Sequence, residues 1–112
     1  GKAQLIYTSL DNNVVASYES MYKAATEIKV PLVASDTGSF ARGAAAVLGV
    51  NYHDIGVEVG KIIARILRGE AAGSIPSQRM NKFDLYLSPK HAREQGITIP
   101  DELLKTATQV TE

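Results

Sequence analysis

Residues 3–38 read AQLIYTSLDNNVVASYESMYKAATEIKVPLVASDTG, and this stretch decides the fold. The run 3–8 is a short apolar segment rich in β-forming residues, which is typical of a buried strand. The next apolar residues recur at helical spacing, at Val14, Tyr18, Met21, Ala25 and Ile28. Pro31 ends that helix and is followed by a second apolar run, 32–35. Strand, helix and strand with short links predict a βαβ unit, with two parallel strands and a right-handed crossover.

The rest of the chain predicts one more strand and helix, followed by a C-terminal section. Residues 44–50 form a third apolar run, and a helix is expected over residues 54–68. The apolar face of that helix comprises Ile55, Val59, Ile62, Ile63 and Ile66. Alternation over residues 83–87 predicts an edge strand, a short helix is expected to begin at Ser88-Pro89, and a last weak helix lies around Leu103. The sequence therefore predicts an α/β fold with an open parallel sheet.

Composition excludes several classes of protein. The chain has 112 residues, of which 45% are hydrophobic and 21% charged, which is typical of one globular domain. Twelve basic residues balance twelve acidic ones, which argues against nucleic-acid binding by bulk charge and against a polybasic membrane tether. Cysteine is absent, which excludes disulfides, thiol nucleophiles and cysteine-based metal sites. Because a strand begins almost at once without an initiating methionine, we expect Gly1 to be a cut end.

Acidic residues follow the first two predicted strands, at Asp11 and Asp36. Ligands of open parallel sheets bind beyond the carboxyl ends of the strands, and neighbouring strands bring their loops side by side. The same edge carries Thr8, Ser9, Asn12, Asn13, Ser35, Thr37 and Ser39. These groups predict a site for a polar or cationic small molecule, such as one with an ammonium group. Asp11 and the two asparagines could equally cap the helix, whereas Asp36 has a weaker structural role, so a binding function is favoured there.

Other chemistry fits the sequence less well. Phe40 and Tyr52 fall near the proposed edge and could either stack on a flat ligand or pack in the core or rim. His53 and His91 belong to no metal-ligand pattern, and no glycine-rich phosphate loop is present. The triplet 36–38 resembles that of aspartic proteases, but their fold is almost wholly β, and this chain has two strong helical patterns. No catalytic residue, cofactor or metal site is predicted.

Several motifs occur in a fixed order along nearly the whole chain. They are a strand followed by Asp11-Asn12, then VPLVASDTGS (30–39), RGA (42–44), LGVNY (48–52), Gly56, LRGE (67–70), FDLYL (83–87) and QGITIP (95–100). Their order and spacing resemble the extracytoplasmic solute-binding proteins of ABC importers, within the family that includes tryptophan- and tyrosine-binding lipoproteins. The resemblance implies a type I periplasmic-binding fold, in which two Rossmann-like lobes joined by hinge crossings enclose the ligand.

Family members are far longer, so the resemblance implies that this chain is the C-terminal part of a two-lobe protein. Residues 1–43 would then be a partial second lobe, and residues 44–81 a hinge strand with a helix that packs on the first lobe. Residues 82–112 would be the return strand and C-terminal helices. Because the helix over 54–68 would lose its partner surface, we expect the chain alone to self-associate or to pair with the rest of its own protein.

The resemblance implies a binding function without catalysis or a cofactor. The solute would be small and polar, with aromatic amino acids suggested by the family alone. The expected ligand-binding residues are Thr8, Asp11, Asn12, Ser35, Asp36, Thr37, Phe40 and Tyr52. The expected partner is an ABC permease, and the expected location is the periplasm or, as a lipoprotein, the cell surface. Two alternatives stay open: the effector domain of a sugar-responsive repressor, and a phosphotransfer domain with Asp11 and Asp36 as magnesium ligands.

Overall fold

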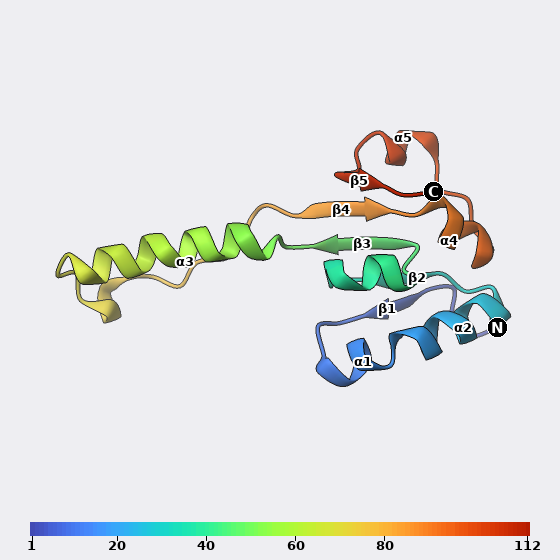
Figure 1. The fold of residues 1–112 in the computed structure, drawn as a ribbon, viewed down its shortest axis with the longest axis horizontal. Coiled ribbons are helices and arrows are strands. Elements are labelled where there is room, and N and C mark those ends of the chain that lie inside the picture. Colours follow the sequence, from blue (N-terminus) through green and yellow to red (C-terminus); the bar gives the residue numbers. More distant parts are fainter.

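The computed structural model describes all 112 residues and contains a single five-stranded sheet in the order β1-β2-β3-β4-β5 (Figure 1). Strands β1 (Ile6–Thr8), β2 (Leu32–Ala34) and β3 (Ala46–Gly49) run parallel. Strand β4 (Asp84–Leu87) is antiparallel to β3, and β5 (Gln109–Val110) is parallel to β4. The α/β class and the parallel pairing of the first two strands are therefore as predicted.

Helices form most of the connections between the strands. They are α1 (Asn12–Ala16), α2 (Tyr18–Ile28), the 3-10 helix η1 (Thr37–Arg42), α3 (Tyr52–Leu67), the 3-10 helix η2 (Ala72–Ser74), α4 (Pro89–Glu94) and α5 (Asp101–Leu104). The single helix expected after β1 is divided in two at Ser17. Side-chain caps begin α1, α3 and α4 at Asp11, Asn51 and Ser88. The start of a helix at Ser88-Pro89 is as predicted, and capping is one of the two roles considered for Asp11. None of the helices combines the length and apolar character needed to span a membrane.

The main core lies where α2 and η1 meet the first three strands. Its buried residues are Tyr18, Ala25, Leu32, Ala34, Phe40, Ala44 and Val47. A second, smaller cluster comprises Ala45, Leu87, Ala92 and Ile99. The helical pattern predicted over α1 and α2 supplies Tyr18 and Ala25 to the main core, but Ile28 at its end is 62% exposed. Lys29, which follows it, has a φ of 55° and turns the chain away into β2.

The expectation that residues 83–87 form an edge strand is wrong. Strand β4 lies between β3 and β5, with Leu87 fully buried and Asp84 also buried. Phe83, the first residue of the predicted strand, precedes β4 and is 52% exposed. The edge is instead β5, whose two residues are too few to show any alternation in the sequence.

Helix α3 and its return segment form an arm that extends away from the sheet (Figure 1). The molecule therefore measures 56 × 32 × 22 Å. None of the sixteen residues of α3 is buried, and Val59 and Ile63 on its apolar face are 47% and 49% exposed. The helix is where the sequence predicted it, and its apolar face is only partly covered, by the return segment 78–82, which lines a cavity together with Ile55, Val59 and Ile62.

An ion pair between Arg42 and Glu19 joins η1 to α2. The Arg42 Nε and Nη2 atoms each donate to one carboxylate oxygen of Glu19 at 2.7 Å. These hydrogen bonds lower the pKa of Glu19 from its ordinary 4.5 to about 2. The cation of Arg42 is thereby engaged by Glu19, and it also lies 5.7 Å above the ring of Tyr18.

This ion pair predicts how stability changes in acid. The pKa of Glu19 is lower in the folded than in the unfolded state, so the pair stabilises the protein above pH 4.5 and ceases to do so as the pH falls to about 2. We expect Glu19→Gln to flatten the dependence of Tm on pH within this interval, by a small amount because the pair is solvent-exposed. Thermal melts from pH 7 to 2 measure it. The control is Glu27→Gln, an exposed acid on the same helix with no ion pair, and a curve for Glu19→Gln parallel to that of the control would contradict the prediction.

Candidate functional site

The ends of the three parallel strands meet at one edge of the sheet, here called the carboxyl edge and defined by Thr8, Ser35, Asp36, Thr37 and Gly49. Thr8 pairs with Ala34, and the Ser35 backbone N–H and hydroxyl both donate to the Thr8 carbonyl at 3.1 Å. A Cβ atom on Gly49 would lie 2.9 Å from the Ser35 carbonyl oxygen and 3.0 Å from the Thr37 methyl carbon. A larger residue at position 49 would therefore push β3 away from the other two strand ends.

Asp36 leaves β2 at this edge and is half-buried. Its side chain does not cap the backbone of η1; its Oδ2 accepts a hydrogen bond from the buried Ser39 hydroxyl at 2.9 Å. Asp36 forms no ion pair, because the nearby Arg42 is bound to Glu19. A carboxylate can accept about four hydrogen bonds, so Asp36 keeps most of its capacity for a cationic or donor group.

Asp11 reaches the same edge from the end of β1, because β1 and β2 are parallel neighbours. Its Oδ1 accepts from the backbone N–H groups of Asn13 and Val14 at 2.9 and 3.1 Å, so Asp11 caps α1. Asn12 is exposed in the first turn of that helix. The two predicted acids thus leave the sheet at one edge. Asp36 accepts one hydrogen bond within the chain, whereas Asp11 accepts two.

The two aromatic candidates lie in different environments. Phe40 is only 7% exposed and packs in the main core, with its ring 5.3 Å from that of Tyr86. The expectation that it lines the edge is therefore wrong, and the alternative of core packing holds, because η1 turns back over the sheet and carries Phe40 inward. Tyr52 is 61% exposed at the first position of α3 and keeps a free ring face.

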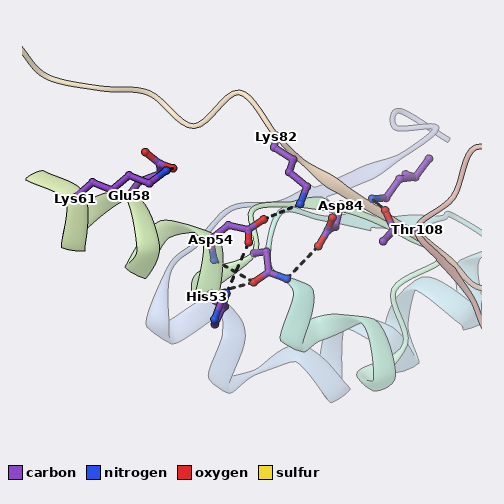
Figure 2. Close-up of polar contacts among 9 residues, drawn as sticks. His53, Asp54, Glu58, Lys61, Lys82, Asp84 and Thr108 are labelled. Carbon is purple, nitrogen blue, oxygen red and sulfur yellow. Dashed lines mark hydrogen bonds and ion pairs between the residues drawn. The ribbon is translucent and has the colours of Figure 1, made fainter.

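Sequence reasoning missed a polar cluster at the base of the arm (Figure 2). Asp84 pairs with Gly49 across β3 and β4, and its Oδ2 accepts from Asn51 Nδ2 at 3.4 Å. Beside it, Lys82 Nζ lies 2.9 Å from Asp54 Oδ2, which lowers the pKa of Asp54 and raises that of Lys82. Because β4 is antiparallel to β3, its first residue meets the ends of the parallel strands. The sequence shows Asp84 within the motif FDLYL, but its place at the carboxyl edge depends on the direction of β4.

The two histidines lie in different environments. His91 Nδ1 lies 3.3 Å from the Ala44 carbonyl oxygen, and its ring packs edge-on against Tyr22 at 5.6 Å. His53 is exposed at the start of α3. No three side chains of His, Cys, Asp or Glu come together in a way that could hold a metal ion. The arrangement at the carboxyl edge is suited to binding through hydrogen bonds and through the negative charge of Asp36, with Asp11 in the adjacent loop.

Known proteins share both the sequence and the fold of this chain. The tyrosine-binding protein of Clostridioides difficile (strain R20291) is 32% identical over 88 residues, which cover 79% of this chain and 26% of that protein. A conserved domain protein from Vibrio cholerae has a crystal structure that matches with a TM-score of 0.86 at 37% identity, covering 98% of this chain and 37% of that one. An ABC domain from Streptococcus pneumoniae, solved in complex with L-Trp, matches with a TM-score of 0.83 at 30% identity. This match also covers 98% of this chain and 37% of that one.

These matches confirm the predicted fold class, an α/β Rossmann-like sheet of the periplasmic-binding type. The chain spans about a quarter of the length of its tyrosine-binding relative and just over a third of the two solved chains. A family model described as ABC transporter substrate binding protein matches residues 1–111. This chain therefore belongs to the ABC transporter substrate-binding protein family.

Proposed function

We propose that this chain forms one face of the solute site in the extracytoplasmic binding component of an ABC importer. The solute is an amino acid, with an aromatic side chain as the leading candidate. Family membership supports the binding role, and the tyrosine-binding relative and the L-Trp complex support the class of solute. Residues 1–43 and 82–112 then belong to the second lobe, and the arm within residues 44–81 reaches the first. The protein acts in the periplasm or at the cell surface as a lipoprotein, and its partner is a membrane permease.

The observation that carries the proposal is the carboxylate of Asp36. It lies half-buried at the carboxyl edge without a cationic partner, because Arg42 is paired with Glu19. An amino acid brings an ammonium group that needs such a partner once the lobes exclude water. Thr8, Ser35 and Thr37 supply hydrogen bonds around it, Asp11 and Asn12 lie in the adjacent loop, and Tyr52 offers an exposed ring. Phe40 is left out because it is buried in the core.

The test is the affinity of the full-length protein for L-tryptophan and L-tyrosine, measured by calorimetry. We expect Asp36→Asn to weaken binding about a hundredfold, since it removes the charge that the buried ammonium group contacts. Glu27→Gln, which removes an exposed acid from the far end of α2, is the matched control and should leave the affinity unchanged. Equal affinities for Asp36→Asn and wild type would refute the role of Asp36. A wild-type protein that binds neither compound would refute the proposed solute class.

Asp11 is tested in the same series. Because asparagine caps helices about as well as aspartate, Asp11→Asn keeps α1 and removes only the charge. A loss of affinity in this variant assigns Asp11 to the solute as well, whereas unchanged affinity leaves it as a capping residue. Its contribution is expected to be smaller than that of Asp36, since one of its oxygens already accepts two backbone hydrogen bonds.

Neither alternative function gains support. The family match is to substrate-binding proteins, and nothing in it favours a sugar-responsive repressor. The phosphotransfer alternative needs a cationic side chain to contact the phosphate, and the carboxyl edge offers none. The uncharged groups of the edge are hydroxyls and a glycine, and the nearby Arg42 is paired with Glu19.

A further inference from the structure

The first turn of α3 is linked to the start of β4 by two polar contacts (Figure 2). One is the hydrogen bond from Asn51 Nδ2 to Asp84 Oδ2 at 3.4 Å, and the other is the ion pair between Lys82 and Asp54. Asn51 Oδ1 also accepts from the backbone N–H groups of His53 and Asp54, at 2.9 and 3.4 Å. The amide of Asn51 is therefore engaged at both ends, by the helix on one side and by the sheet on the other.

Asp84 is a buried carboxylate that forms no ion pair. It is 9% exposed, and the nearby Lys82 is paired with Asp54 instead. Alternation along β4 places Asp84 on the same face as Tyr86, which packs against the main core. Burial of a carboxylate without a cation costs free energy, so an apolar residue would serve packing better at this position. The contact that Asp84 makes within the chain is the one with Asn51.

Tyr52, the first residue of α3, lies in the turn that these contacts hold. It is 61% exposed, so packing of its own side chain does not fix the position of its ring. That position depends on the backbone of the turn, which Asn51 caps and Asp84 links to the sheet. Gly49, three residues earlier, belongs to the carboxyl edge and pairs with Asp84. The ring therefore leaves the chain close to the proposed solute site.

We propose that Asp84 is a positioning residue of the solute site: through Asn51 it holds the first turn of α3, so that the ring of Tyr52 stacks on the aromatic side chain of the bound amino acid. This inference rests on the proposed function. A turn that is already held loses less conformational freedom when the solute binds, which strengthens binding without a new contact. Asp36 then binds the ammonium group, and Asp84 acts on the recognition of the ring.

The experiment removes the contact between Asp84 and Asn51 and keeps the cap. Serine caps helices about as well as asparagine but has no amide to donate, so Asn51→Ser is the main variant. Calorimetry on the full-length protein should show that Asn51→Ser and Asp84→Ala each weaken L-tryptophan binding about fivefold, as for the loss of one hydrogen bond. The double variant should bind no more weakly than either single variant. Asp84→Asn, which keeps an acceptor oxygen, should bind more tightly than Asp84→Ala.

The dependence on Tyr52 separates positioning from a merely structural contact. Tyr52→Ala should itself weaken L-tryptophan binding, and Asn51→Ser should have no further effect once the ring is absent. A structural contact alone would weaken binding by the same factor with or without the ring. The matched control is Lys61→Met, which removes the ion pair between Lys61 and Glu58 within α3 and should leave the affinity unchanged.

Three results would overturn the inference. They are an unchanged affinity in Asn51→Ser, an unchanged affinity in Tyr52→Ala, and an effect of Asn51→Ser that persists without the ring. If Asp84→Ala does not fold, Asn51→Ser and its combination with Tyr52→Ala decide the matter. Any of these results with Asp36→Asn still defective leaves the proposed function intact, whereas a wild-type protein that binds neither L-tryptophan nor L-tyrosine would overturn both.

Discussion

Gln95→Leu is expected to lower the free energy of unfolding by about 4 kcal/mol, because it leaves two buried backbone groups without partners. Gln95 is fully buried behind α4 and joins two distant segments. Its Oε1 accepts from the Leu32 backbone N–H at 2.7 Å, and its Nε2 donates to the Gly43 carbonyl at 2.7 Å. Leucine has a similar volume, so the effect isolates the hydrogen bonds from the packing.

Urea unfolding of the full-length protein, followed by circular dichroism, measures this loss. Hydrogen exchange at the Leu32 amide should accelerate in the same variant, since this amide loses its acceptor. Gln4→Leu, at an exposed glutamine before β1, is the matched control and should change stability little. A loss in Gln95→Leu as small as in the control would show that the two hydrogen bonds contribute little.

The 112-residue chain on its own is expected to self-associate through the apolar face of α3. The face is large and remains partly open to solvent: Val59, Ile63 and Ile66 are between 40% and 49% exposed. Exposed apolar surface of this extent favours association in water. Replacing Val59 and Ile63 together by lysine should convert the associated species to a monomer, because it places two charges at the centre of the contact.

Size-exclusion chromatography with light scattering measures the mass of each species. The control adds the same charge elsewhere, by Ser20→Lys and Ala24→Lys at exposed positions of α2, and should remain associated. A wild-type chain that elutes as a monomer of 12.0 kDa would contradict the prediction. If the face is instead covered by the first lobe of the full-length protein, the same lysines should lower the stability of that protein.

The elements that the sequence predicted are those determined by local interactions. The caps at Asp11 and Ser88 are each set by a few neighbouring residues. The parallel pairing of β1 and β2 followed from the short helical connection between them. By contrast, the interior position of β4 depends on its pairing with Gln109, more than twenty residues further along, and no local pattern encodes this contact.

The same distinction between local and long-range determinants applies to the candidate site. The edge at which Asp11 and Asp36 lie could be predicted, because it follows from strand direction alone. The inward position of Phe40 could not, since it depends on how the short η1 helix turns back over the sheet. The contact between Asp84 and Asn51 was equally hidden, because it depends on the antiparallel pairing of β3 and β4.

The way the arm is attached has a mechanical consequence. The chain leaves the sheet through β3 and returns through β4, and these strands are hydrogen-bonded neighbours that end together at Gly49 and Asp84 (Figure 1). Two hydrogen-bonded strands hold the base of the arm at two points, so rotation of the arm about its own length is more restricted than it would be for a helix attached by a single strand. Gly49 also lies against Ser35 and Thr37. A change in the position of either residue would therefore be passed directly to the end of β3, where the arm begins.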